Sequence, residues 1–164
     1  MRRGAKGIIP ALPRGVHTCG RDFIAERRKE MKIIYRDGTV AECPEEEVTH
    51  VLRHSAAHIM AQAIQHLFPD ADFGYGPATE RGFYYDVDLG DRKLTDEDLA
   101  SIEEEMKKIV KANIPIKPFI LPRDEAVKLM QERGAKYKEE HIGDLPEDAV
   151  ISFYQQGDYI DMCV

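Results

Sequence analysis

The chain has 164 residues, of which 43% are hydrophobic and 32% charged, a balance typical of a globular protein rather than a disordered or fibrous one. No apolar run approaches the ~18 residues of a membrane-spanning helix, so a soluble protein without a membrane partner is expected. The net charge of −7 argues against a protein that coats nucleic acid, and DNA is not expected as a partner. Three scattered cysteines cannot form a disulfide framework, which favours the reducing cytoplasm.

Residues 1–30 differ from the rest of the chain in charge. They hold eight Lys/Arg against three Asp/Glu, whereas residues 31–164 hold 15 against 27. Glycines and prolines interrupt the segment, and no helical or strand period is sustained in it. Its acidic residues also speak against a targeting peptide. We expect residues 1–30 to be a disordered or extraneous basic tail.

Patterns of regular structure begin at Met31. Two β-rich runs, Lys32–Tyr35 and Thr39–Cys43, are joined by an Asp-Gly turn, which predicts a hairpin and an N-terminal unit over residues 31–47. Apolar residues then recur at spacings of three and four, and they predict a long helix from about Thr49 to Phe68. The expected apolar stripe of this helix is Leu52, Ala56, Ile59, Ala63 and Leu67.

Glycines bracket the next two candidate strands, Asp72–Tyr75 and Gly82–Asp88. In the second, the side chains alternate in character with the period of two that is typical of a half-buried strand. Thr95 and the acidic residues after it resemble a capping box, which opens a helix to about Ala112. The expected inward stripe of this second helix is Ile102, Met106, Ile109 and Val110.

The last third of the chain predicts one more helix and three strands. Two prolines confine the extended run Ile114–Leu121 to a sheet edge. A helix from about Asp124 to Arg133 ends at Gly134, and a closing hairpin spans Ala149–Tyr154 and Tyr159–Met162. The order lacks the alternation of a parallel sheet. It predicts an α+β fold, with a mainly antiparallel sheet, a long central helix and two further helices packed on it.

Two histidines of the long helix, His54 and His58, lie four residues apart and therefore share one face. The spacing suits a metal ion, but a zinc-protease motif needs Glu where Ser55 stands, which excludes that class. On spacing alone, solvated surface histidines and a functional site are equally good interpretations. His66 and His141 fit no motif and are expected at the surface.

Five short motifs follow one another in a set order and spacing. They are Arg53-His54-Ser55-Ala56-Ala57-His58, Gly76-Pro77, Gly82-Phe83-Tyr84-Tyr85-Asp86, Ile151-Ser152-Phe153-Tyr154 and Asp161-Met162-Cys163. From about Val51 to Cys163 the chain thereby resembles the N-terminal editing domain of bacterial threonyl-tRNA synthetases, which is related to that of alanyl-tRNA synthetases. The resemblance implies an editing domain over residues 48–164.

The resemblance also implies the site residues. The implied catalytic residues are His54, His58, Lys138, Asp161 and Cys163, and the implied substrate-binding residue is Tyr85. The two histidines match the His-X3-His motif of the family, and the cysteine matches the start of its Cys-X3-His motif. Without the resemblance, Lys138 would be interpreted as a solvated residue of a charged stretch.

The family hydrolyses the ester of serine that has been attached to tRNA(Thr) by mistake. One methyl group in a binding pocket discriminates by only ~1–3 kcal/mol, or ~10–200-fold, so a second, hydrolytic pocket is needed to reject serine. Hydrolysis needs an activated water and positive charge near the developing oxyanion. A histidine can accept the proton of water, Lys138 can stabilise negative charge, and Asp161 can orient an amine or a water.

The family continues with Arg-Gly-Pro-His after this cysteine, whereas the chain ends at Val164. We therefore expect a fragment that lacks the aminoacylation core and is weakly active or inactive alone. ATP would be a cofactor only of the full-length family enzyme, which dimerises through domains absent here. Zinc is possible, because His54, His58 and Cys163 with the further histidine would make a Cys/His3 set. Related alanyl-type domains hold zinc there, whereas threonyl-type sites are described as working without it.

Two other functions stay open. The chain could be a freestanding hydrolase that clears mischarged tRNA, or a non-catalytic binding module such as the one fused to some nucleoside kinases. In the editing interpretations the partner is the acceptor end of tRNA(Thr), and the compartment is the cytoplasm.

Overall fold

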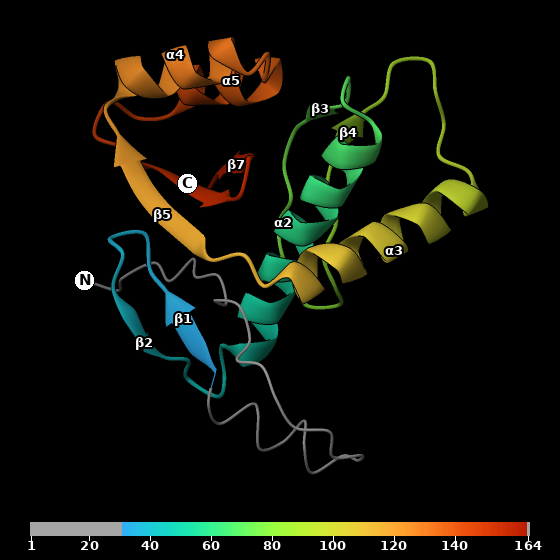
Figure 1. Ribbon diagram of the computed structural model, residues 1–164. Coiled ribbons are helices and arrows are strands. Elements are labelled where there is room, and N and C mark those ends of the chain that lie inside the picture. Colours follow the sequence, from blue (N-terminus) through green and yellow to red (C-terminus); the bar gives the residue numbers. More distant parts are fainter. Residues whose placement is uncertain (1–30, 164) are drawn as a thin grey trace.

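The structure is a computed structural model that describes residues 31–163, so the basic tail expected over residues 1–30 lies outside the described residues. Helices and antiparallel strands are mixed along the chain, which confirms the predicted α+β class. The elements of Figure 1 are, in chain order, β1 (Lys32–Ile34), β2 (Val40–Glu42), α2 (Val48–Leu67), β3 (Asp72–Phe73), β4 (Val87–Asp88), α3 (Asp96–Ala112), β5 (Ile116–Leu121), α4 (Arg123–Glu132), α5 (Lys136–Asp144), β6 (Ile151–Gln156) and β7 (Tyr159–Met162).

The predicted antiparallel arrangement is confirmed, and the described strands are divided among three separate sheets instead of one. β1 pairs with β2, β3 pairs with β4, and the third sheet has the order β5-β6-β7. β5 lies at an edge as predicted, where the missing N–H of Pro118 costs least. Of the predicted strand Gly82–Asp88, only Val87–Asp88 forms a strand, which is β4. Before it along the chain there is a single β-bridge between Ala78 and Phe83. Pro77, which has no N–H to donate, stands in the facing segment.

The sheet β5-β6-β7 packs each of its faces against a different part of the molecule. Strand geometry sends alternate residues to opposite faces, so Ile160 and Met162 lie on one face of β7 and Asp161 lies on the other. The first face packs under α4 and α5, which lie together over this sheet in Figure 1. The buried residues of this main core are Ala126, Met130, Ile142, Ile151, Phe153 and Met162. The second face is turned toward α2.

Helix α2 packs against α3, and the predicted apolar stripes are correct only in part. Ala63 of the first stripe is buried with Ile102 of the second, but Leu52 and Leu67 are 40% and 38% exposed. Val110 is 50% exposed as well. Leu52 and Leu67, at the two ends of the first stripe, are exposed because α2 turns a different row of side chains, a polar one, toward β7. That row consists of His54, His58 and Gln62.

A fourth described helix, α5, was not predicted. Its sequence is mostly polar, and only Lys138 and Ile142 are buried, so it has no apolar stripe that a periodicity search could detect. The preceding helix α4 ends as expected, with Gly134 in the left-handed region at φ 66°. A short turn therefore leads directly from α4 into α5.

The capping box at the start of α3 is confirmed. The Thr95 hydroxyl accepts a hydrogen bond from the backbone N–H of Asp98 at 3.2 Å, and the Asp98 carboxylate accepts one from the backbone N–H of Thr95 at 3.0 Å. Thr95→Ala should lower the free energy of unfolding by about 1 kcal/mol, measured by urea denaturation. Ser101→Ala is the control in the same helix, since among the described residues that hydroxyl bonds only to the Glu97 carbonyl. Equal losses in the two variants would refute the capping role.

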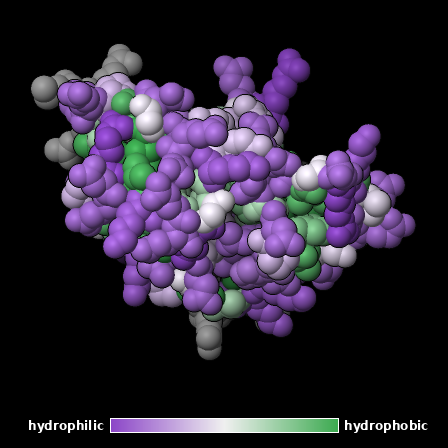
Figure 2. All heavy atoms as spheres, turned by 90° about the horizontal axis from the view of Figure 1, so that it is seen from above, coloured by the Kyte–Doolittle hydropathy of each residue, from purple (hydrophilic) through white to green (hydrophobic). Residues whose placement is uncertain are grey.

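The face of the molecule seen in Figure 2 is largely hydrophilic, and hydrophobic side chains form small separate patches on it. Among residues 31–163, no helix has the length and apolar character to cross a membrane.

Candidate active site

The site begins with the two histidines of α2. Their four-residue spacing places both rings on the face turned toward β7, where His54 and His58 are only 7% and 8% exposed. The two Nε2 atoms lie 3.0 Å apart. Solvated surface histidines are therefore excluded, whereas His66 is exposed as expected and contacts Glu105.

Cys163 meets these histidines from the end of β7. Its Sγ lies 3.2 Å from Nε2 of His54. The backbone N–H of Cys163 donates to the Ser152 carbonyl at 2.9 Å, and the Ser152 hydroxyl donates to the Cys163 carbonyl. These bonds to β6 fix the thiol beside α2.

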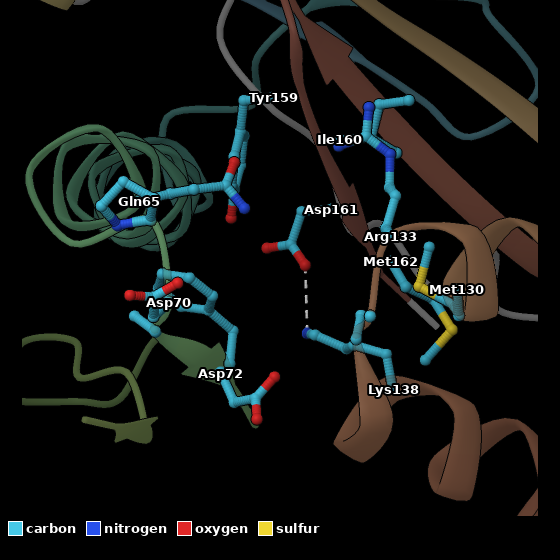
Figure 3. Close-up of a pocket in the computed structure, with 15 residues that line it drawn as sticks. Gln65, Asp70, Asp72, Met130, Arg133, Lys138, Tyr159, Ile160, Asp161 and Met162 are labelled. Carbon is cyan, nitrogen blue, oxygen red and sulfur yellow. Dashed lines mark ion pairs between the residues drawn. The ribbon is translucent and has the colours of Figure 1, made fainter. Parts of the chain in front are cut away.

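Asp161 is the centre of the polar cluster. Its Oδ1 lies 3.0 Å from Nζ of Lys138, an ion pair that Figure 3 marks with a dashed line. Its Oδ2 accepts a hydrogen bond from the Tyr85 hydroxyl at 2.5 Å and lies 2.9 Å from Nδ1 of His58. This last contact is an ion pair when the His58 imidazole is protonated. Lys138 also donates to the Tyr85 hydroxyl at 3.0 Å, which closes a ring of contacts.

Lys138 is not solvated as its charged surroundings suggest, because the two residues before it anchor α5. Lys138 is 6% exposed. The preceding Lys136 lies 2.8 Å from the carboxylate of Asp72, and the Tyr137 hydroxyl donates to Asp88 at 2.6 Å. These contacts hold the first turn of α5 against the β3–β4 sheet and turn the ammonium of Lys138 inward.

The charges of the cluster support one another. Burial raises the pKa of the Asp161 carboxyl, but Lys138 and His58 outweigh burial and hold this pKa well below its usual range. Burial lowers the pKa of His58, yet the Asp161 carboxylate raises it to about 9. Burial raises the pKa of Cys163, and hydrogen bonds from His54 and His58 lower it to about 6. Burial and the Asp161 charge raise the pKa of Tyr85 well above its ordinary value.

All six predicted site residues line one cleft of about 570 Å³. Sequence reasoning did not assign the other lining residues to the site, and among them are His50, Tyr75, Gly76, Tyr84 and His141. His141 was expected at the surface, but its ring packs edge-on against Tyr75 at 4.8 Å. The sequence gives little indication that His141 belongs to the site, because the helix that carries it, α5, was not predicted.

Tyr159 is another residue near Asp161 that sequence reasoning missed. It lies two positions before Asp161 and is buried beside it on a smaller cavity of about 250 Å³, which Figure 3 shows. Lys138, Asp161 and Met162 line both cavities and so form the wall between them. The alternation of side chains along β7 could have indicated Tyr159, because residues two apart in a strand lie on the same face.

The donor set of His54, His58 and Cys163 fits a zinc ion. Their three ligand atoms lie within 4.8 Å of one another, and tetrahedral zinc places such atoms roughly 3.3–3.6 Å apart. Two imidazoles and a thiolate are ligands that zinc prefers. The contact of His58 with Asp161 is also the carboxylate support that orients metal-bound histidines.

Comparison with known proteins gives the relatives of the chain. The chain matches no family model. The threonine–tRNA ligase of Clostridioides difficile is 55% identical over 119 residues, which are 73% of this chain and 18% of the ligase. That of Acetivibrio thermocellus is 54% identical over 111 residues, 68% of this chain and 17% of the ligase. That of Clostridium novyi is 43% identical over 146 residues, 88% of this chain and 23% of the ligase. The chain thus spans about a fifth of the length of the curated relatives it matches, and these relatives are threonine–tRNA ligases.

Proposed function

We propose that the chain is the editing segment of a threonine–tRNA ligase and that its cleft hydrolyses the ester of seryl-tRNA(Thr). The observation that carries the proposal is the convergence of six buried or half-buried polar side chains from α2, α5, β7 and the β3–β4 connection on one cleft. Buried charges of this density destabilise a fold unless they are paired, and they concentrate where a reaction uses them.

The ester is cleaved by water. The water oxygen bonds to the carbonyl carbon while a base takes a proton from it, and the bond to the ribose oxygen then breaks as that oxygen takes a proton. We assign the role of base to His54, because Asp161 holds the neighbouring His58, whereas Nδ1 of His54 has no hydrogen-bond partner among residues 31–163.

Lys138 and Asp161 serve the two charged parts of the substrate. An ammonium has three donors, and Lys138 uses two of them on Asp161 and Tyr85, which leaves one for the developing oxyanion. The Asp161 carboxylate attracts the α-amino group of the amino acid. Tyr85 holds both groups through its hydroxyl and so fixes the separation of the two charges.

Zinc held by His54, His58 and Cys163 would supply a Lewis acid and a bound water of lowered pKa, and His54 would then be a ligand instead of the base. The acceptor end of tRNA(Thr) is the proposed partner, and the cytoplasm, where tRNA is charged, is the proposed compartment. The remaining parts of the ligase would supply aminoacylation and further contacts to the tRNA.

Binding of a stable substrate analogue tests this proposal. Adenosine that carries serine through a 3′-amide in place of the ester cannot be hydrolysed readily, and calorimetry should show that it binds the chain. The threonyl amide should bind ~10–200-fold more weakly, since its extra methyl group must be excluded. Adenosine alone is the control. Equal affinity for all three ligands would show that the cleft does not recognise the amino acid, and the editing function would be wrong.

A further inference from the structure

Gly76 lies directly against the ring of Tyr85. A Cβ atom added at Gly76 would be 2.2 Å from Cδ2, 2.3 Å from Cε2 and 3.0 Å from Cγ of that ring. These distances are far inside van der Waals contact, so no side chain can be placed here unless the tyrosine moves.

Space, and not backbone conformation, is the reason for a glycine at this position. The described glycines with positive φ are Gly38, Gly90, Gly134 and Gly157. Gly76 is not among them, so an alanine could adopt its backbone conformation. The three atoms nearest to an added Cβ all belong to the Tyr85 ring, so this ring sets the requirement for glycine.

The ring is also held on its other sides. The ring of Phe73 packs on it edge to face, with 5.7 Å between centroids and 87° between planes. The hydroxyl at its end contacts Asp161 at 2.5 Å and Lys138 at 3.0 Å. The Phe73 ring opposes a sideways shift, so we expect a push from Gly76 to lengthen the contacts of the hydroxyl.

We propose that Gly76 is a positioning residue that sets the place of the Tyr85 hydroxyl between Lys138 and Asp161. It acts through the tyrosine ring and touches neither charged group. The inference rests on the proposed function for its effect on rate, whereas its effect on packing is independent of that function.

Gly76→Ala is the direct test, in this chain, with Gly82→Ala as the matched control. Gly82 belongs to the same connection between β3 and β4, also lacks a positive φ, and has nothing within 4 Å of an added Cβ. Gly76→Ala should lower the melting temperature by roughly 3–12 °C, the range expected for an overpacked site in a domain of this size. It should also lower the rate of seryl-tRNA(Thr) deacylation by about 10²-fold, as a misplacement of about 1 Å can do. Gly82→Ala should change neither quantity.

Double variants separate positioning from packing. Tyr85→Phe keeps the ring and removes the hydroxyl, so adding Gly76→Ala to it should still lower the melting temperature but should lower the rate no further. Tyr85→Ala removes the ring, so adding Gly76→Ala to it should change neither quantity.

Two results would overturn the proposal. One is a melting temperature of Gly76→Ala equal to that of Gly82→Ala, which would show that the ring tolerates the added methyl. The other is an equal loss of rate from Gly76→Ala with and without the Tyr85 hydroxyl. If deacylation is too slow to measure, a crystal structure of Gly76→Ala decides the question. The proposal requires the hydroxyl to leave hydrogen-bond distance of Lys138 or Asp161, and an unmoved hydroxyl refutes it while leaving the editing function untouched.

Discussion

Lys138→Met should lower the free energy of unfolding by about 3 kcal/mol, which is the lower end of the ~3–5 kcal/mol lost when one partner of a buried ion pair is removed. The variant keeps most of the side-chain volume but leaves the Asp161 carboxylate, 4% exposed, without its ammonium partner. His58 still faces that carboxylate and limits the loss. Urea denaturation followed by circular dichroism measures the effect.

Lys136→Met is the matched control for this prediction. Lys136 lies two residues earlier on the same helix and also pairs with carboxylates, those of Asp72 and Asp88, but its side chain is exposed to solvent. Exposed pairs contribute ~0–1 kcal/mol, so the control should lose less than a third as much stability. Similar losses in both variants would mean that the Lys138–Asp161 pair is not buried as described.

His54→Ala should lower the rate of serine release from seryl-tRNA(Thr) by ~10²–10⁴-fold, the usual contribution of a general base. The expectation follows from the contacts of His54 with His58 and Cys163 in the lining of the cleft. Single-turnover kinetics with protein in excess measures the rate, and circular dichroism checks that the variant is folded.

His66→Ala removes the same side chain from the same helix three turns later, where it is exposed and contacts only Glu105 among the described residues. Its rate should equal that of the unchanged protein. If His54→Ala is as fast as His66→Ala, another group takes the proton and the assignment of the base fails.

The sequence predicted most of the fold wherever short-range patterns decide it. The capping box at Thr95, the stop of α4 at Gly134 and the edge position of β5 each depend on the chemistry of one or two residues, and all three are present. The division into three sheets depends on which strands pair across the molecule, and no local pattern carries that information. Helix α5 was missed because its buried residues are one lysine and one isoleucine.

The prediction of the apolar stripe of α2 was correct only in part, and the reason is that this helix carries residues of the site. A search for amphipathic patterns assigns polar residues to solvent, yet this helix buries the row His54, His58 and Gln62. The candidate site residues came from the resemblance of ordered motifs, and period and charge alone would have left Lys138 on the surface. The pairing that buries Lys138 is formed with Asp161, 23 positions further along the chain, so no local pattern could show it.

The most direct measurement of the central claim is the release of amino acid from tRNA(Thr) charged with serine or with threonine. It should be made on the chain itself and on the chain with Arg-Gly-Pro-His placed after Cys163, with protein in excess over tRNA. The serine ester should decay faster than without protein, most clearly in the second protein, while the threonine ester should decay at the rate without protein. His54→Ala should remove the acceleration. Decay of the serine ester at the protein-free rate in both proteins, or equal acceleration for both esters, would contradict the editing function.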